Sequence, residues 1–235
     1  MKSHAHNFIF SIIKISLSFM LLLVGCENYT HRGTDQPQLK SVWVDRILNE
    51  KICNLPCWEG ITPGMTTIFE ALEILQSNDL FIGLKDPVLI RDSPITYELA
   101  WQTKSDTGGG IARSVGENYA IRSIYLSLSK ERPEITINEI IAHFGEPDSL
   151  IIEEDRGLCI GNLFYSEKAV TVVFSERCRK KMSVSENQVV DSIELFPLGI
   201  STFPEVEYFR SNTLEFILYW TGYGEYPITK KIQIE

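Results

Sequence analysis

The sequence predicts an α+β fold of tandem units, each a helix followed by antiparallel strands, with the helices packed on one face of the sheet. Three observations predict it. Two helix-start motifs with the same apolar spacing lie 69 residues apart, since 136 − 67 = 69. Segments with strand-like alternation follow each motif. Residues 158–166 and 169–178 form a candidate hairpin that brings two cysteines together.

The first 25 residues have the pattern of a secretory signal peptide. Lys2 and Lys14 provide positive charge, and no acidic residue comes before Glu27. A mostly apolar run follows at residues 15–24. It is about half as long as the roughly 20 residues that a membrane-spanning helix needs. We therefore predict that residues 1–25 are a cleaved signal peptide.

The segment that ends this run, LVGC at residues 23–26, resembles the bacterial lipobox. In lipoproteins the lipobox cysteine carries fatty acyl chains such as palmitate, and the chain is cut just before it. The resemblance implies that Cys26 is the lipidation site and the first mature residue. It places the protein outside the cytoplasm on a bacterial membrane, either the outer face of the cell membrane or the outer membrane. A membrane anchor with a chance cysteine is the alternative.

The composition after the signal divides the mature chain into a tether and one domain. Residues 26–40 carry the lipidated cysteine and a polar segment with Gly and Pro, which would span roughly 20 Å as a flexible chain. We expect residues 41–235 to form a single α+β domain with two repeats, at about 60–130 and 131–200, and a C-terminal extension.

The net charge argues against nucleic acid as a partner. The chain carries a formal charge of −9, and removal of the two signal lysines makes it −9 − 2 = −11. Phosphate backbones repel such a domain. The hydrophobic fraction of 44% is typical of a globular domain.

Each predicted repeat begins with a capping box, in which a threonine and a glutamate three residues later satisfy each other's backbone amides. The boxes are Thr67–Glu70 and Thr136–Glu139. Apolar residues follow at helical spacing. They are Ile68, Ala71, Leu72 and Leu75 in the first helix, and Ile137, Ile140, Ile141 and Phe144 in the second.

Strand-like segments follow both helices. The expected strands are 95–103 and 119–128 after the first helix, and 149–154, 158–166, 169–175 and 189–196 after the second. Residues 41–50 are a candidate short helix. We interpret the Gly108–Gly110 run between two strands as a mobile loop, because it lacks the Lys-Ser/Thr of a phosphate-binding loop.

The four cysteines beyond Cys26 predict two disulfides in an exported protein. Three pairings are possible, and we favour Cys53–Cys57 and Cys159–Cys178. If Lys168-Ala169 is the hairpin loop, opposite residues sum to 337 and Cys159 faces Cys178. A register slipped by two would make these cysteines diagonal neighbours, which are still close.

The helix-start segments resemble two known protein families. Residues 64–67 (GMTT), and Thr136 through Gly145-Glu146-Pro147, look like the Gly-Met-Thr … Leu-Gly-x-Pro pattern of the small outer-membrane assembly lipoproteins. They are also similar to the tandem repeats of the β-lactamase-inhibitory-protein fold. The resemblance implies a helical pair on an antiparallel sheet and a role in binding a protein. The first repeat lacks the Gly-x-Pro ending, and the second lacks the leading Gly-Met.

Residues for common catalytic chemistries are scarce. The mature chain has two histidines, His31 in the tether and His143, which we expect to be a solvated helix residue. We interpret the acidic run 153–155 as a solvated strand end and not a calcium site. We expect no cofactor and no metal. A hydrolase that uses carboxylates alone stays open, because such pairs are spatial.

The densest aromatic segment, residues 216–226, is a candidate binding surface for a protein or a sugar. Its candidate residues are Tyr219, Trp220, Tyr223 and Tyr226, joined by Trp58; the alternative is that these rings close the core. We expect a membrane-anchored, non-catalytic scaffold or binding module whose partner is another envelope protein. The alternatives are a glycan or small-ligand binder and a carboxylate-dependent hydrolase.

Overall fold

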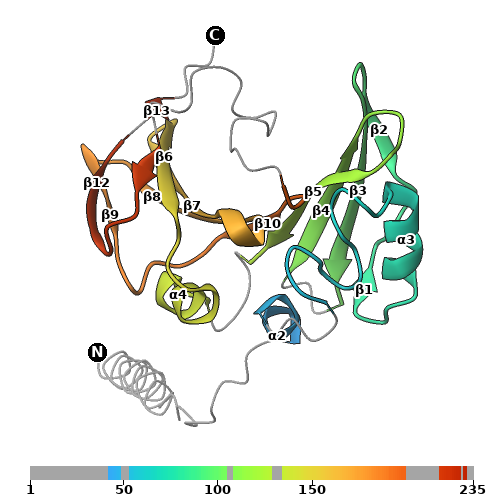
Figure 1. The fold of residues 1–235 in the computed structure, drawn as a ribbon, viewed down its shortest axis with the longest axis horizontal. Helices are drawn as coiled ribbons and strands as arrows, with labels where there is room; N and C mark the ends of the chain where they lie inside the picture. Colours follow the sequence, from blue (N-terminus) through green and yellow to red (C-terminus); the bar gives the residue numbers. More distant parts are fainter. Residues whose placement is uncertain are drawn as a thin grey trace, which may run out of the picture. The chain divides into compact units, whose positions relative to one another are not determined.

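The computed structural model describes residues 42–48, 53–104, 108–128, 134–199, 217–228 and 230–231 (Figure 1). The expected signal peptide, the tether and Cys26 lie outside the described residues. Every described element belongs to the compact unit Leu39–Glu235. In the described part of the chain, no helix is long and apolar enough to cross a membrane.

The described residues are mostly antiparallel sheet with few helices, which confirms the coarse α+β prediction. The helices are α2 (Val42–Leu48), α3 (Ile68–Gln76) and α4 (Ile137–Phe144), with a 3-10 turn, η2 (Ser166–Lys168). The strands are β1 (Phe81–Ile82), β2 (Val88–Asp92), β3 (Ile95–Thr103), β4 (Gly109–Val115), β5 (Ile121–Ser127), β6 (Ser149–Asp155), β7 (Leu158–Tyr165), β8 (Val170–Arg177), β9 (Lys181–Val184), β10 (Ser192–Leu195), β11 (Leu218–Tyr219), β12 (Gly224–Pro227) and β13 (Lys230–Lys231).

One large sheet has the strand order β1-β3-β4-β5-β10-β8-β7-β6-β11. The short strand β1 and the longer strand β2 both pair with β3, and β13 pairs in parallel with β6. Strands β5 and β10 meet in the middle of the sheet in antiparallel register. A separate pair, β12-β9, completes the described strands.

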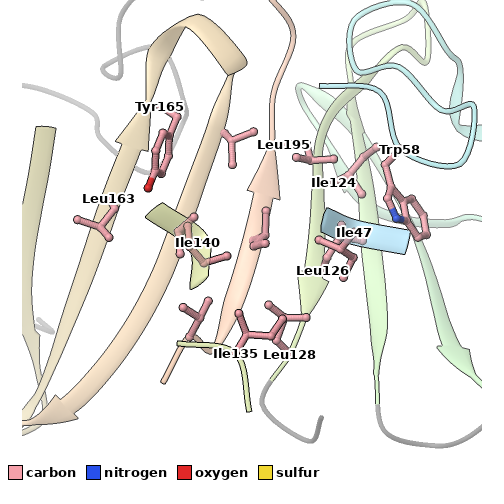
Figure 2. Close-up of a cluster of buried hydrophobic side chains, with 14 of the residues drawn as sticks. Ile47, Trp58, Ile124, Leu126, Leu128, Ile135, Ile140, Leu163, Tyr165 and Leu195 are labelled. Atoms are coloured by element: carbon pink, nitrogen blue, oxygen red, sulfur yellow. The ribbon is translucent and has the colours of Figure 1, made fainter. Parts of the chain in front are cut away.

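Because strand side chains alternate, the sheet has two chemically different faces. We call one the core face: its residues share a single buried cluster with side chains from α2, α3 and α4. Figure 2 shows this cluster, with Ile47 from α2 and Ile140 from α4 near Leu126, Leu163 and other strand residues. We call the other the open face; on β3 it carries Glu98, Ala100 and Gln102.

Helices α3 and α4 both begin as predicted, at complete capping boxes. The backbone N–H of Thr67 donates to Glu70 Oε2 at 2.8 Å, and that of Thr136 donates to Glu139 Oε2 at 3.0 Å. In return each threonine hydroxyl accepts from the glutamate backbone N–H. The α4 helix ends at Gly145, whose φ of 84° a side chain would disfavour.

We expect the Thr136→Ala variant to lose about 1 kcal/mol of unfolding free energy, because the backbone N–H of Glu139 loses its acceptor, the Thr136 hydroxyl, at the start of α4. Urea denaturation followed by circular dichroism measures this loss. The Thr136→Ser variant keeps the hydroxyl and is the matched control. An equal loss in both variants would show that the methyl group of Thr136, and not its cap, stabilises the helix.

Both predicted disulfides are present, Cys53–Cys57 and Cys159–Cys178. The hairpin that carries the second one forms, but its predicted register is wrong by two residues. The connection contains the three-residue turn η2 and then Ala169 with φ 50°, so it is longer than the two-residue loop we assumed. Cys159 therefore faces Glu176, and Cys178 is its diagonal neighbour.

The prediction of a mobile loop at Gly108–Gly110 is also wrong. Gly109 and Gly110 begin strand β4 and are buried. The physical reason is close packing across the sheet. A Cβ atom on Gly110 would lie 2.3 Å from Cζ2 of Trp101, so only glycine lets this ring lie flat on the neighbouring strand.

Candidate functional site

A cleft of about 640 Å³ lies on the sheet at β3, β4 and β5, and its floor is the open face of these strands. The connection between β1 and β2 contributes Lys85 and Asp86. The lining residues are Gly83, Lys85, Asp86, Val88, Glu98, Ala100, Trp101, Gln102, Gly108, Gly109, Gly110, Ile111, Tyr125 and Ser127. The volume falls within the range of small-molecule and peptide-anchor sites.

Small residues at the centre of the open face make the hollow. Ala100 on β3 pairs with Ile111 on β4, and Gln102 pairs with Gly109. A Cβ atom on Gly109 would lie 2.6 Å from the backbone oxygen of Trp101, so this position cannot carry a side chain without a backbone shift. The centre of the floor is therefore apolar and lies close to the backbone, while Gln102 and Ser127 make part of the lining polar.

An ion pair borders the apolar floor. Arg113 Nε donates to Glu98 Oε2 at 2.9 Å, between neighbouring strands of the open face. Both side chains are partly exposed, so the pair contributes little net stability and serves mainly to fix the position of Glu98. The rim of the cleft also carries Lys85 and Asp86, so it offers both signs of charge to a ligand.

The middle of the open face holds one carboxyl group with a strongly shifted pKa. Burial raises the pKa of Glu194 to about 7, against the opposing effects of a hydrogen bond from Ser123 and the positive charge of Arg113. Glu194 pairs across β10 and β5 with Tyr125, which lines the cleft. Glu194 itself is not among the lining residues, so the cleft does not place this raised-pKa carboxyl against a ligand.

The predicted aromatic surface divides between the core and the exterior. Trp58 and Tyr226 are only 3% and 5% exposed, which corrects their assignment to a binding surface. Trp58 stacks on Trp101 with ring centroids 5.4 Å apart. Trp220 is partly buried and stacks on Tyr226. Their large apolar rings are more stable in the core than in water.

Two of the predicted aromatic residues do reach the surface. Tyr219 is 83% exposed, and Tyr223 is 38% exposed and donates a hydrogen bond to Asn138. Tyr219 lies on β11 and Tyr223 lies in the bend just before β12, and neither residue lines the cleft. The structure therefore does not gather the predicted aromatic residues into one site.

Two other residues singled out in the sequence, His143 and Glu153, do not line the cleft. His143 is exposed on α4, with its ring 5.0 Å from that of Phe144. Glu153 is 7% exposed, which corrects the prediction that the whole run 153–155 is solvated; it faces the parallel strand β13 at Lys230. No group of three or more His, Cys, Asp or Glu in the described ranges could hold a metal ion.

The cleft residues Val88, Ala100, Ile111 and Tyr125 were missed at the sequence level. The alternation in residues 95–103 places Ala100 on the face away from the core, but it does not show that a hollow forms there. The glycine run was the one local signal, because adjacent glycines in a strand indicate a close approach of backbone or ligand.

Comparison with known proteins adds no assignment: no protein-family model, curated protein or solved structure matches the chain.

Proposed function

We propose that this chain is a lipid-anchored extracytoplasmic lipoprotein whose domain is a non-catalytic module that binds another envelope protein. The lipobox resemblance at Cys26 supports the anchor, and the acidic charge argues against nucleic acid. The observation that carries the binding role is the cleft on the open face. A sheet that served only as scaffold has no need of a hollow with an apolar floor and a charged rim.

We further propose that the domain consists of two tandem units related by an offset of 69 residues. The backbone N–H of Ile68 donates to Tyr119 O at 2.9 Å, and that of Ile137 donates to Gln188 O at 2.9 Å. The offsets are 137 − 68 = 69 and 188 − 119 = 69. The same hydrogen bond therefore ties each capped helix to the chain just before β5 or β10.

Two further contacts repeat with the same offset. Ile121 donates to Thr66 O at 2.9 Å, and Val190 donates to Ile135 O at 2.9 Å. The bridges Thr67↔Ala120 and Thr136↔Val189 also correspond. At the centre of the sheet Tyr125 pairs with Glu194, and 194 − 125 = 69. The central pair thus joins two equivalent positions, as expected where a local two-fold axis relates two copies of one unit.

Cross-linking in intact bacterial cells that express the full chain tests the binding role. We expect the wild type to capture a defined envelope protein, identified by mass spectrometry, and the Cys26→Ser variant to lose it because the domain is no longer held at the membrane. If the wild type and the Cys26→Ser variant capture the same partner, the lipid anchor is not needed for binding and this part of the proposal is wrong. Absence of any captured protein, with the wild type confirmed in the membrane fraction, would overturn the protein-binding role.

A glycan or small-molecule ligand is the second candidate, because the cleft volume also suits such ligands. A sugar site would use the ring of Tyr125 as its stacking surface. Soluble peptidoglycan fragments that bind the full chain and lose affinity in the Tyr125→Ala variant would favour this candidate over the protein partner.

A further inference from the structure

We propose that the cleft receives an extended polypeptide segment of the partner protein, which adds to the outer edge of β2 and places an aliphatic side chain over Val88 and Ala100. This inference rests on the proposed protein-binding function and specifies the shape of the ligand. The central strands β5 and β10 divide the sheet into a first half, from β1 to β5, and a second half, from β10 to β11. The inference follows from the chain segment that lies at the equivalent place in the second half.

The equivalent place is found by counting strand partners outward from the central pair. On one side Tyr125 pairs with Ile111, which pairs with Ala100. On the other side Glu194 pairs with Thr171, which pairs with Phe164. Ala100 on β3 therefore corresponds to Phe164 on β7.

The next strand outward gives the second equivalence. Val88 on β2 pairs with Glu98, two residues before Ala100. Ile151 on β6 pairs with Asn162, two residues before Phe164. Val88 therefore corresponds to Ile151, and the edge strand β2 corresponds to β6.

In the second half, the chain's own C-terminal segment occupies this position. Ile151 and Phe164 form a separate buried cluster on the open face, and Ile217 packs against it. The next two residues, Leu218–Tyr219, form β11 and pair with the outer edge of β6. In the second half, the outer edge of β6 is thus occupied by an extended segment that turns one aliphatic side chain, Ile217, onto the open face.

In the first half, the same edge and the same surface are unoccupied by any described strand. Strand β2 pairs with β3, and no other strand in the described residues pairs with it. Val88, Leu89 and Ile90 are 60%, 45% and 51% exposed. Three consecutive exposed aliphatic residues on a sheet edge are a ready template for strand addition.

The geometry of the edge specifies how such a strand would bind. Val88 lines the cleft, and Leu89 points to the opposite face because it pairs with Tyr97 on the core face. An added strand would direct alternate side chains into the cleft and toward Leu89. The ligand is therefore a segment with aliphatic residues on its cleft-facing positions, bound through its backbone at β2.

A peptide with the sequence of residues 211–221 (SNTLEFILYWT) is the probe, because it contains the segment that fills the second half. Its fluorescent form is titrated by anisotropy with the purified full-length chain in detergent micelles. We expect saturable binding that weakens about ten-fold or more in the Val88→Asp and Ala100→Asp variants, because each puts a charge into the apolar contact. The control variant is Ala142→Asp, on the exposed side of α4, with unchanged affinity.

Changes in the peptide test the strand geometry. Replacement of its isoleucine (Ile217→Asp) should abolish binding. Two further peptides carry N-methyl groups at every second residue, one at the odd positions and the other at the even positions. We expect only one of them to lose binding, because a strand turns every second N–H toward its neighbour. Loss in both or in neither would overturn strand addition.

The other outcomes overturn the inference. Failure of the peptide to bind, binding that ignores both cleft variants, or binding of peptidoglycan fragments in place of the peptide would each do so. Failure of the wider function is distinguishable: a partner captured from cells by wild type and Ala100→Asp alike would keep the protein-binding role and reject only the cleft as its site.

Discussion

The Trp101→Ala variant should lose about 3–5 kcal/mol of unfolding free energy, a large share of a typical domain's stability. Trp101 is 3% exposed, stacks on Trp58 and meets the edge of Phe81 with ring centroids 6.5 Å apart. Its indole N–H has no hydrogen-bond partner among the described residues, so truncation leaves no partner unsatisfied. The loss is therefore one of apolar burial and packing, and urea denaturation at 25 °C measures it.

Gly110, which pairs with Trp101, and Gly109, which pairs with Gln102, provide a matched test of this packing. In the wild type, both Gly110→Ala and Gly109→Ala should cost about 1–3 kcal/mol through overpacking. The Gly110 Cβ would meet the ring of Trp101, whereas the Gly109 Cβ would meet its backbone oxygen. In a Trp101→Ala background the cost of Gly110→Ala should fall, and that of Gly109→Ala should stay the same.

The double-mutant cycle separates the ring contact from a general weakness of β4. Gly110→Ala will keep part of its cost, because its Cβ would also lie 2.7 Å from the backbone oxygen of Tyr125. Additive costs for Trp101→Ala and Gly110→Ala would contradict the explanation that glycine is required there by the ring.

Local chemistry made the helices predictable from the sequence. A capping box is a contact between residues three apart, so Thr136 and Glu139 define the start of α4 without information from the rest of the chain. The hairpin register was not determined in this way. A slip by two residues keeps every apolar side chain on its face. The alternation of apolar residues therefore could not show whether Cys159 lies opposite Cys178, as predicted, or opposite Glu176, as observed.

Features that depend on tertiary contacts could not be predicted. Gly110 is present because of Trp101 on the neighbouring strand, and the sequence alone made the glycine run look like a loop. The cleft depends on three strands and the β1–β2 connection together, and its centre, Ala100, looks like an ordinary small residue of a half-buried strand. The buried position of Trp58 likewise depends on Trp101, a residue far along the chain.

The stability of the domain should decrease between about pH 4.5 and pH 7 because of Glu194. Burial raises the pKa of this carboxyl from its ordinary value of 4.5 to about 7 in the folded chain. Below both values the group is neutral in both states and costs nothing. As the pH rises, the unfolded chain releases its proton first, so the folded state binds more protons and loses stability until the pH passes the folded pKa. At about 1.4 kcal/mol per pKa unit, the full loss is at most about 3 kcal/mol.

The Glu194→Gln variant should remove this dependence, because a neutral amide has no ionisation penalty in the same position. We expect the variant to match the wild type near pH 4 and to be more stable at pH 8 by up to about 3 kcal/mol in urea denaturation. Other carboxyls, including Asp191, whose pKa burial also raises, titrate in both proteins, so the difference between the two curves isolates Glu194. Glu167→Gln changes an exposed residue on η2 and should reproduce the wild-type curve. Parallel stability curves for the wild type and Glu194→Gln would show that Glu194 keeps an ordinary pKa and that water reaches its carboxyl at the centre of the open face. A gain in stability of the variant that is confined to high pH would show that the native state holds the Glu194 carboxyl in its neutral form.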